Sequence, residues 1–151
     1  MEDNMSTTQT DVDTNKRYVA GGELPPLAIL EEGTSLKGIL RRVDAFQQEI
    51  TIKGKTTVEE RTYYRFELTE RLEAFDADKE AVSYPNGATV TLPGAGHLNW
   101  LFRDAAQDFG FSEIRGLVGL PMKVEYRGQE VMKTGPMKGK KCKKYILIIN
   151  P

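Results

Sequence analysis

The side chains with the clearest chemical potential in this sequence are cations near its C-terminal end. From Lys133 to Lys144 the chain places six lysines around two glycines and one proline. Residues 115–151 carry nine basic and two acidic side chains, whereas residues 1–34 carry two basic and seven acidic ones. Because such a local cluster attracts polyanions whatever the net charge of the chain, it predicts a partner with a phosphate backbone. The alternative interpretation is that these lysines only solvate an exposed hairpin.

A second feature is a strand that combines aromatic rings with a cation. Residues 63–69 alternate in polarity, so Tyr64 and Phe66 should face a core while Tyr63 and Arg65 face outward. A single strand bound without sequence preference needs cations along its phosphates and flat rings on which its bases stack. Tyr63 and Arg65 are therefore candidate ligands. The alternatives are a half-buried surface tyrosine and an arginine in a cross-strand ion pair.

The candidate nucleic-acid-binding residues are cations or exposed rings on the predicted strands and on the C-terminal hairpin. The full set is Lys37, Arg41, Tyr63, Arg65, Lys123, Arg127, Lys133, Lys138, Lys140, Lys141, Lys143 and Lys144. Trp100 and Phe102 lie at helical spacing and are expected in the core instead. We expect His97 to be a surface or cap residue without a chemical role.

Catalytic and metal-binding chemistry lacks the residues that it needs. One histidine, His97, and one cysteine, Cys142, cannot form a histidine- or cysteine-based metal centre. Residues 54–56 resemble the end of a phosphate-binding loop, but Glu49 stands where that loop has a glycine. We therefore predict a protein that is not an enzyme, with no catalytic residue, no metal site and no cofactor.

The size and composition of the chain are those of one folded domain with a tail. Its 151 residues include 39% hydrophobic and 28% charged side chains, which is enough apolar surface to form a core. No segment has the roughly 20 apolar residues of a membrane helix, and residues 1–13 lack the basic and apolar pattern of a secretory signal. Together with the single cysteine, this predicts a cytoplasmic protein without a membrane partner.

The elements that must position the candidate residues are mostly strands. Residues 1–26 are polar and acidic and then contain glycines and prolines, so we expect a flexible acidic N-terminal tail and linker. The helical spacing of Leu98, Leu101 and Phe102 predicts one amphipathic helix over residues 96–109. Residues 71–81 are compatible with a short helical excursion. Apolar alternation predicts strands at residues 35–46, 50–53, 63–69, 89–92, 122–127 and 144–149.

This order of elements predicts the fold class. We expect an all-β chain with one helix, in which residues 27–151 form a five-stranded OB-fold-like barrel with an extended basic C-terminal β-hairpin. In an OB-fold one helix separates the third and fourth barrel strands. The basic hairpin then corresponds to the loop between the last two barrel strands.

Three segments carry a resemblance to a known family. They are residues 35–40 (SLKGIL), residues 63–68 (YYRFEL) and residues 119–128 (GLPMKVEYRG), the last of which leads into the lysine-rich residues 135–144. In this pattern the chain resembles OB-fold single-stranded DNA-binding proteins, in particular the small, divergent kind encoded by bacteriophages. The resemblance covers residues 27–151. It implies binding of single-stranded DNA with little sequence preference, during replication or recombination in a bacterial host cell.

The resemblance also implies replication or recombination proteins as further partners, and it leaves a homo-oligomer open. Bacterial housekeeping members of the family end in an acidic tail that recruits partners, whereas the acidic segment here is N-terminal. A second hypothesis is a virion or assembly structural protein, whose acidic N-terminal arm docks on the basic hairpin of a neighbouring subunit. The opposite charges of the two ends favour this hypothesis equally.

Overall fold

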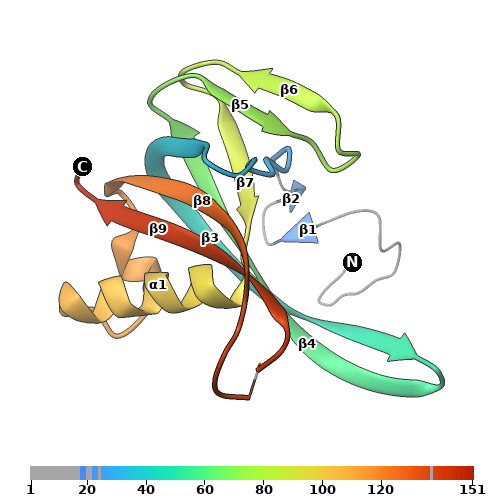
Figure 1. The fold of residues 1–151 in the computed structure, drawn as a ribbon. Helices are drawn as coiled ribbons and strands as arrows, with labels where there is room; N and C mark the ends of the chain where they lie inside the picture. Colours follow the sequence, from blue (N-terminus) through green and yellow to red (C-terminus); the bar gives the residue numbers. More distant parts are fainter. Residues whose placement is uncertain (1–17, 20–21, 24, 137) are drawn as a thin grey trace. The chain divides into compact units, whose positions relative to one another are not determined.

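The structure, a computed structural model, describes residues 18–19, 22–23, 25–136 and 138–151 (Figure 1). Most of the predicted flexible tail therefore lies outside the described residues. Two short strands fall within the predicted linker, β1 (Tyr18–Val19) and β2 (Gly22–Glu23), and they pair with each other in antiparallel fashion. No helix in the described part of the chain is both long enough and apolar enough to cross a bilayer.

The chain divides into two compact units. Of the described residues, the hairpin unit contains 18–19, 22–23 and 45–61, and the main unit contains 25–44, 62–136 and 138–151. In the hairpin unit two strands meet at Lys53 and Gly54, whose φ angles of 54° and 77° are both positive. Positive φ at both central residues is typical of a two-residue β-hairpin turn.

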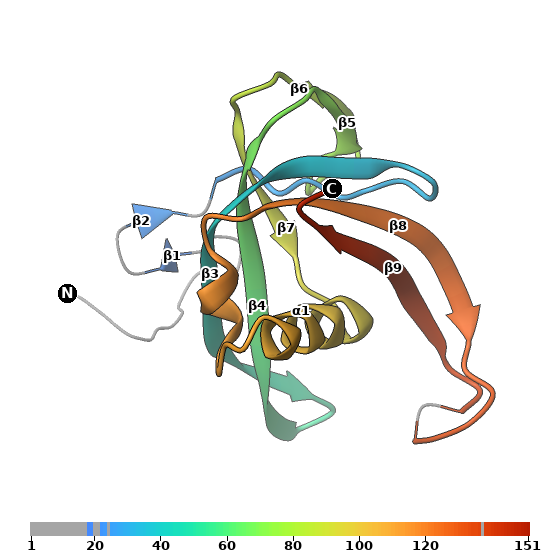
Figure 2. The same cartoon turned by 90° about the vertical axis from the view of Figure 1, so that its left-hand side faces the viewer.

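The main unit is built on a five-stranded sheet. Its strands are β3 (Ser35–Ile52), β4 (Lys55–Leu68), β7 (Thr89–Pro93), β8 (Pro121–Val131) and β9 (Lys141–Ile149), of which β3 and β4 continue into the hairpin unit. Their order in the sheet is β7-β4-β3-β8-β9. The helix α1 (Gly96–Asp108) and the short 3-10 helix η1 (Ile114–Leu117) connect β7 to β8 (Figure 2). The prediction of a mostly β chain with one α-helix is confirmed.

The core lies between the sheet and α1. Tyr64 and Phe66 on β4 are fully buried, as their alternation predicts. The helix contributes Leu98, Phe102 and Ala106, which are spaced four residues apart and therefore lie on one face. The rings of Tyr64 and Phe102 stack with their centroids 4.0 Å apart, and this contact ties α1 to β4.

Other segments hydrogen-bond to both outer strands of the sheet. Beside β7, the Thr91 N–H donates to the Pro26 carbonyl and the Ala28 N–H donates to the Thr91 carbonyl, each at 2.8 Å. Beside β9, the Tyr145 N–H donates to Nδ1 of His97 at 3.0 Å. Because residues 26–28 occupy the edge of β7, β9 cannot pair there. The described strands therefore do not close into the predicted barrel.

Residues 71–81 do not form the short helical excursion considered from the sequence; they belong to a two-stranded hairpin. Its strands are β5 (Leu72–Phe75) and β6 (Ala81–Tyr84). Leu72 and Ala74 are buried and the residue between them is exposed, which is the period of a strand rather than of a helix. The turn is stabilised by the Asp76 carboxylate, which accepts two backbone N–H bonds.

The close approach of β3 to β4 at Gly38 yields a stability prediction. A Cβ atom added to Gly38 would lie 2.7 Å from the Glu67 carbonyl oxygen, so the backbone would have to shift. We expect Gly38→Ala to lower the free energy of unfolding by roughly 1–3 kcal/mol in urea denaturation. Gly96→Ala is the matched control, because the space around Gly96 is open. It should leave stability unchanged or raise it by up to about 1 kcal/mol. Equal stability of the two variants would contradict the close approach.

Candidate nucleic-acid interface

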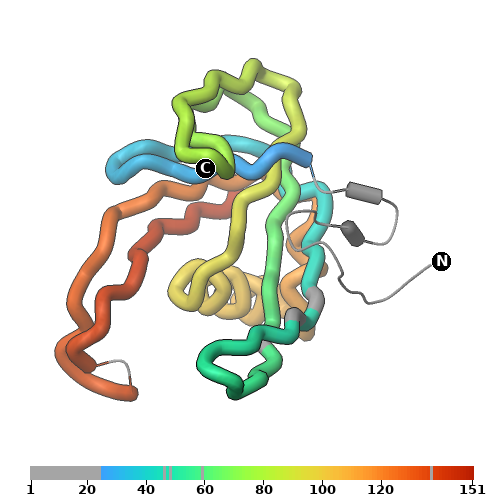
Figure 3. The backbone as a smooth tube through the Cα atoms, turned by 90° about the vertical axis from the view of Figure 1, so that its right-hand side faces the viewer, coloured from blue at the N-terminus to red at the C-terminus, as the bar shows by residue number. Residues whose placement is uncertain are grey.

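A long hairpin extends from β8 and β9 and carries the predicted lysine cluster (Figure 3). We call residues 132–144 the basic arm. Its lysines are Lys133, Lys138, Lys140, Lys141, Lys143 and Lys144, of which only Lys144 is partly buried. None of them forms an ion pair with any residue that the structure describes, and the sequence has no acidic residue after Glu130. Among the described residues, the six positive charges of the arm therefore have no acidic partner.

The direction of the arm is set where it leaves the sheet. The register pairs Tyr126 with Tyr145 and resumes with Gln129 opposite Lys143, so β8 contains one residue more than β9 in this interval. Gly128 lies in this bulge with a φ of 87°, a conformation that favours glycine. A bulge bends its strand and increases the local twist. The lysines are thus carried out of the plane of the sheet.

Lys37 and Lys123 form a second cationic position, on the outward face of β3 and β8. The two residues are directly opposite each other in the antiparallel register. Like charges in that position repel each other. Lys37 has only one ion pair, an exposed one of 3.6 Å to Glu70, and Lys123 has none with the described residues. A phosphate group on this face would relieve the repulsion.

Two other predicted cations already have acidic partners. Arg41 Nη2 lies 2.8 Å from Glu67 Oε1, and Arg127 Nη1 lies 2.8 Å from Glu125 Oε2. Both arginines are exposed, so these pairs contribute little to stability and can be exchanged for a phosphate. They are weaker candidates than the lysines of the arm.

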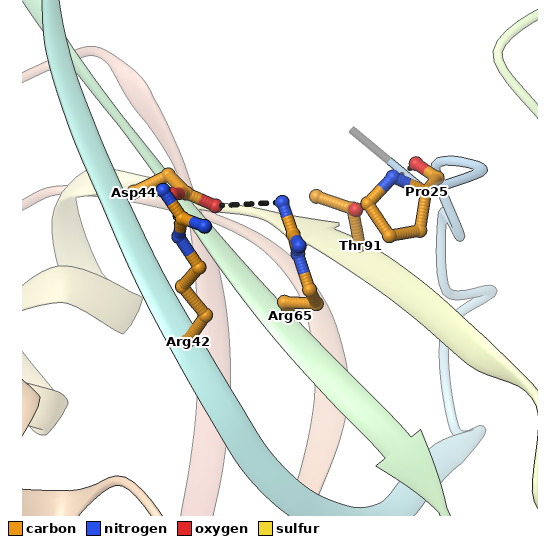
Figure 4. A network of polar contacts seen from close by, with 5 residues as sticks. All are labelled: Pro25, Arg42, Asp44, Arg65 and Thr91. Carbon is orange, nitrogen blue, oxygen red and sulfur yellow. Dashed lines mark hydrogen bonds and ion pairs between the residues drawn. The ribbon is translucent and has the colours of Figure 1, made fainter. Parts of the chain in front are cut away.

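The outward face of β4 is closed, contrary to the prediction for Tyr63. This side chain is only 7% exposed, so it offers little surface on which a base could stack. Opposite Arg65 on β7, Thr91 is fully buried and its hydroxyl donates to the Pro25 carbonyl at 3.0 Å (Figure 4). The prediction of an exposed Tyr63 is therefore wrong. The alternation identified the face of the strand but not what covers it.

Arg65 binds a buried carboxylate instead of facing an open groove. The Asp44 side chain is 4% exposed and accepts hydrogen bonds from Arg42 Nε at 2.6 Å and from Arg65 Nη2 at 3.4 Å (Figure 4). A carboxylate buried to this degree requires such partners. Arg65 Nε is itself buried and has no hydrogen-bond partner. The Arg65 side chain thus helps to compensate the buried charge of Asp44 inside the main unit.

The order of the sheet separates the predicted site into two parts. Tyr63 and Arg65 lie on β4, whereas the basic arm extends from β8 and β9, and β3 and β8 stand between β4 and β9. The structure therefore brings Lys37 to Lys123 and gathers the six lysines in the arm. It does not bring Tyr63 or Arg65 to the arm, so the predicted single wall of rings and cations is not formed.

Trp100 is an exposed ring that the sequence interpretation assigned to the core. It is 54% exposed, whereas Phe102 is fully buried as predicted. The apolar face of α1 is formed by Leu98, Phe102 and Ala106, and a residue two positions after Leu98 falls on the other side of the helix. The spacing of Trp100 from Leu98 and Phe102 therefore already indicates that its side chain lies outside the core.

His97 joins α1 to the root of the arm, the part of β9 at Tyr145 that directly follows the arm. Because its Nδ1 accepts the Tyr145 N–H at 3.0 Å, the neutral ring carries its proton on Nε2. Burial lowers the pKa of His97 below its usual 6.5, the nearby charge of Lys144 lowers it further, and Glu130 partly offsets both. His97, which we expected to have no chemical role, thus makes a structural contact to β9, and the charges of Lys144 and Glu130 on the hairpin affect its pKa.

Beside its positive charge, this region contains a pair of tyrosine rings, and it has no metal-binding cluster among the described residues. Tyr126 and Tyr145 face each other across the strands with ring centroids 5.2 Å apart. Burial, and to a smaller extent Tyr126, raises the pKa of Tyr145 to about 12, so its phenol stays neutral at physiological pH. Within the described ranges, no three histidine, cysteine, aspartate or glutamate side chains are grouped closely enough to hold a metal ion.

The environment of His97 predicts its titration. As the only histidine, it gives a single imidazole signal in NMR spectra, and the midpoint should lie below pH 6.5. The associated stabilisation is complete above about pH 6.5 and is lost as the pH falls through the lowered pKa of the folded state. Lys144→Gln should move the midpoint upward, whereas Lys138→Gln at the far end of the arm should not. A midpoint at or above 6.5 in the unmodified protein would show that this environment is wrongly described.

The opposed lysines predict that stability can be gained by reversing one of the two charges. Lys123→Glu places a carboxylate opposite Lys37 and should raise the free energy of unfolding by about 0.2–1 kcal/mol in chemical denaturation. The matched change Lys138→Glu, on the exposed arm, should alter stability by less than about 0.5 kcal/mol. The gain from Lys123→Glu should shrink in high salt. A loss of stability at low salt would contradict the cross-strand repulsion.

Comparison with protein-family models, curated proteins and solved structures finds no match to this chain.

Proposed function

We propose that this protein binds single-stranded DNA with little sequence preference and that the basic arm lies along the phosphates. The observation that carries this proposal is the set of six arm lysines without an ion-pair partner among the described residues. Binding of a phosphate chain by such a cluster releases the counterions of the nucleic acid, which is the main source of sequence-independent affinity. The proposal needs no contact with base edges.

The form of the arm favours a flexible strand over a rigid duplex. Gly135 and Gly139 have φ angles of 82° and 84° and lie within the turn of the arm. Glycines tolerate other backbone conformations more readily than other residues do. Lysines carry their charge on long, rotatable side chains and bind phosphate as point charges. Such an arm can follow an irregular backbone.

The strand order adds support for an OB-like arrangement. The order β7-β4-β3-β8-β9, with α1 between β7 and β8, is compatible with an OB-fold in which the third and fifth strands do not pair. In this arrangement the basic arm corresponds to the loop between the fourth and fifth strands, which is one of the two ligand-binding loops of OB-folds. The resemblance to phage-type single-stranded DNA-binding proteins further favours a role in replication or recombination.

A second candidate function is that of a virion or assembly component. The observation in its favour is a pair of exposed isoleucines on β9, Ile146 and Ile148, each 41% exposed. Ile148 lies directly opposite Lys123 on the same outward face. An exposed apolar pair is typical of a contact between subunits. Light scattering separates the two functions, because a large assembly that persists without DNA favours the structural role.

The salt dependence of binding tests the proposal. Affinity for labelled oligo-dT, measured by fluorescence anisotropy, should fall linearly on a log–log plot against salt concentration. Lys138→Glu/Lys140→Glu should weaken binding to all sequences alike and reduce the slope by about 1.4, because each phosphate contact contributes about 0.7.

The matched control for these reversals is Arg71→Glu/Arg115→Glu. It changes the net charge equally, but both arginines are exposed and lie outside the arm, on the β5–β6 hairpin and on η1. The control should keep the slope of the unmodified protein. No binding at low salt, or an equal effect of the two double variants, would overturn the assignment to the arm.

A further inference from the structure

The most exposed aromatic ring in the described part of the main unit lies on α1 and not on the sheet. Trp100 is 54% exposed although tryptophan has the largest side chain of the apolar residues. Its position one turn after the start of α1 places it on the side of the helix opposite the buried residues Leu98 and Phe102. Nothing in the core of the main unit requires an indole there.

The ring of Trp100 is held beside a second ring whose position is fixed. His97 lies one turn earlier on α1, with its ring nearly parallel to the indole at 12° and with the centroids 6.3 Å apart. Its Nδ1 is bound to the backbone N–H of Tyr145 at 3.0 Å, which anchors the imidazole to β9. The opposite nitrogen, Nε2, carries the proton and has no hydrogen-bond partner among the described residues. A donor is therefore available next to the indole.

Both rings lie at the root of the basic arm. Tyr145, whose N–H is bound to His97, directly follows Lys144, the last lysine of the arm, and the charge of Lys144 helps to lower the pKa of His97. Figure 1 shows the same junction, where the start of α1 meets β9 at the point from which the hairpin extends. Glu130 is the acidic residue near His97, and its electrostatic effect there is smaller than that of Lys144. A donor and a flat apolar surface thus lie beside the strand residue that follows the last lysine of the arm.

We propose that Trp100, His97 and Lys144 form a nucleotide subsite, in which a base of the bound strand stacks on the indole. The adjoining phosphate accepts a hydrogen bond from His97 Nε2 and is neutralised by Lys144. The subsite rests on the proposed function, because the arm supplies the strand to it. A stacked ring accepts any base, so the subsite adds affinity without adding sequence preference. The aromatic contact with a base is thus made by Trp100 on α1 and not by Tyr63 on the closed outward face of β4.

An abasic oligonucleotide isolates the contribution of the base. It has the phosphates of oligo-dT of the same length but offers nothing to stack. The unmodified protein should bind oligo-dT about tenfold more tightly than the abasic strand, which corresponds to about 1.4 kcal/mol, within the range for one stacked base. Oligo-dT should quench the fluorescence of Trp100, the only tryptophan, whereas the abasic strand should not.

Substitution of the indole then separates the subsite from the arm. Trp100→Ala should bind oligo-dT about tenfold more weakly by anisotropy of a labelled strand and should bind the abasic strand unchanged. Trp100→Phe keeps a ring and should stay within about threefold of the unmodified protein. Phe109→Ala is the matched control, because Phe109 is 45% exposed at the other end of α1, roughly 13 Å along the helix axis. It should leave both affinities unchanged.

The possible failures are distinguishable. If Trp100→Ala binds oligo-dT as the unmodified protein does while Lys138→Glu/Lys140→Glu loses binding, the subsite is wrong and the role of the arm stands. If Phe109→Ala weakens binding as much as Trp100→Ala, the effect is not specific to the subsite and the proposal is overturned. If the unmodified protein binds neither strand at low salt, the proposed function fails and the subsite fails with it.

Discussion

The hydrogen bond from the Tyr145 N–H to Nδ1 of His97, 3.0 Å long, is the contact on which the proposed interface depends. It satisfies a donor at the edge of β9, where a buried and unpaired N–H would be costly. It also fixes the tautomer of the imidazole and joins α1 to the strand that leads into the arm. Because Trp100 follows one turn later on the same helix, its place relative to the lysines is determined by this bond.

The main unit uses its charges in two different ways. Inside, Asp44 is enclosed by Arg42 and Arg65, so a buried carboxylate is compensated where water cannot do so. On the arm, the lysines have no such partners among the described residues, and solvent and salt screen their mutual repulsion. The first arrangement supports the fold. The second places like charges close together, and a bound anion would relieve their repulsion, as the proposed function requires.

The sequence predicts the elements of this protein better than it predicts their surroundings. The alternation around Tyr64 and Phe66 and the spacing of Leu98 and Phe102 identified strand, helix and core, because a side chain's direction follows from local backbone geometry. The burial of Tyr63 could not be read from that pattern. The absence of barrel closure could not be predicted for a related reason. Backbone groups of residues 26–28 bind the edge of β7, and the periodicity of a segment does not predict contacts between residues so far apart in the sequence.

The basic hairpin is predicted from its lysines and from the strand patterns on either side of them, but its direction depends on Gly128. With a positive φ at that position, the extra residue of β8 turns the hairpin without involving any lysine. The charge of the hairpin and its direction therefore depend on different residues. Substitution of a lysine would change the charge of the hairpin and leave its direction unchanged, whereas substitution of Gly128 would change the direction and leave the charge unchanged.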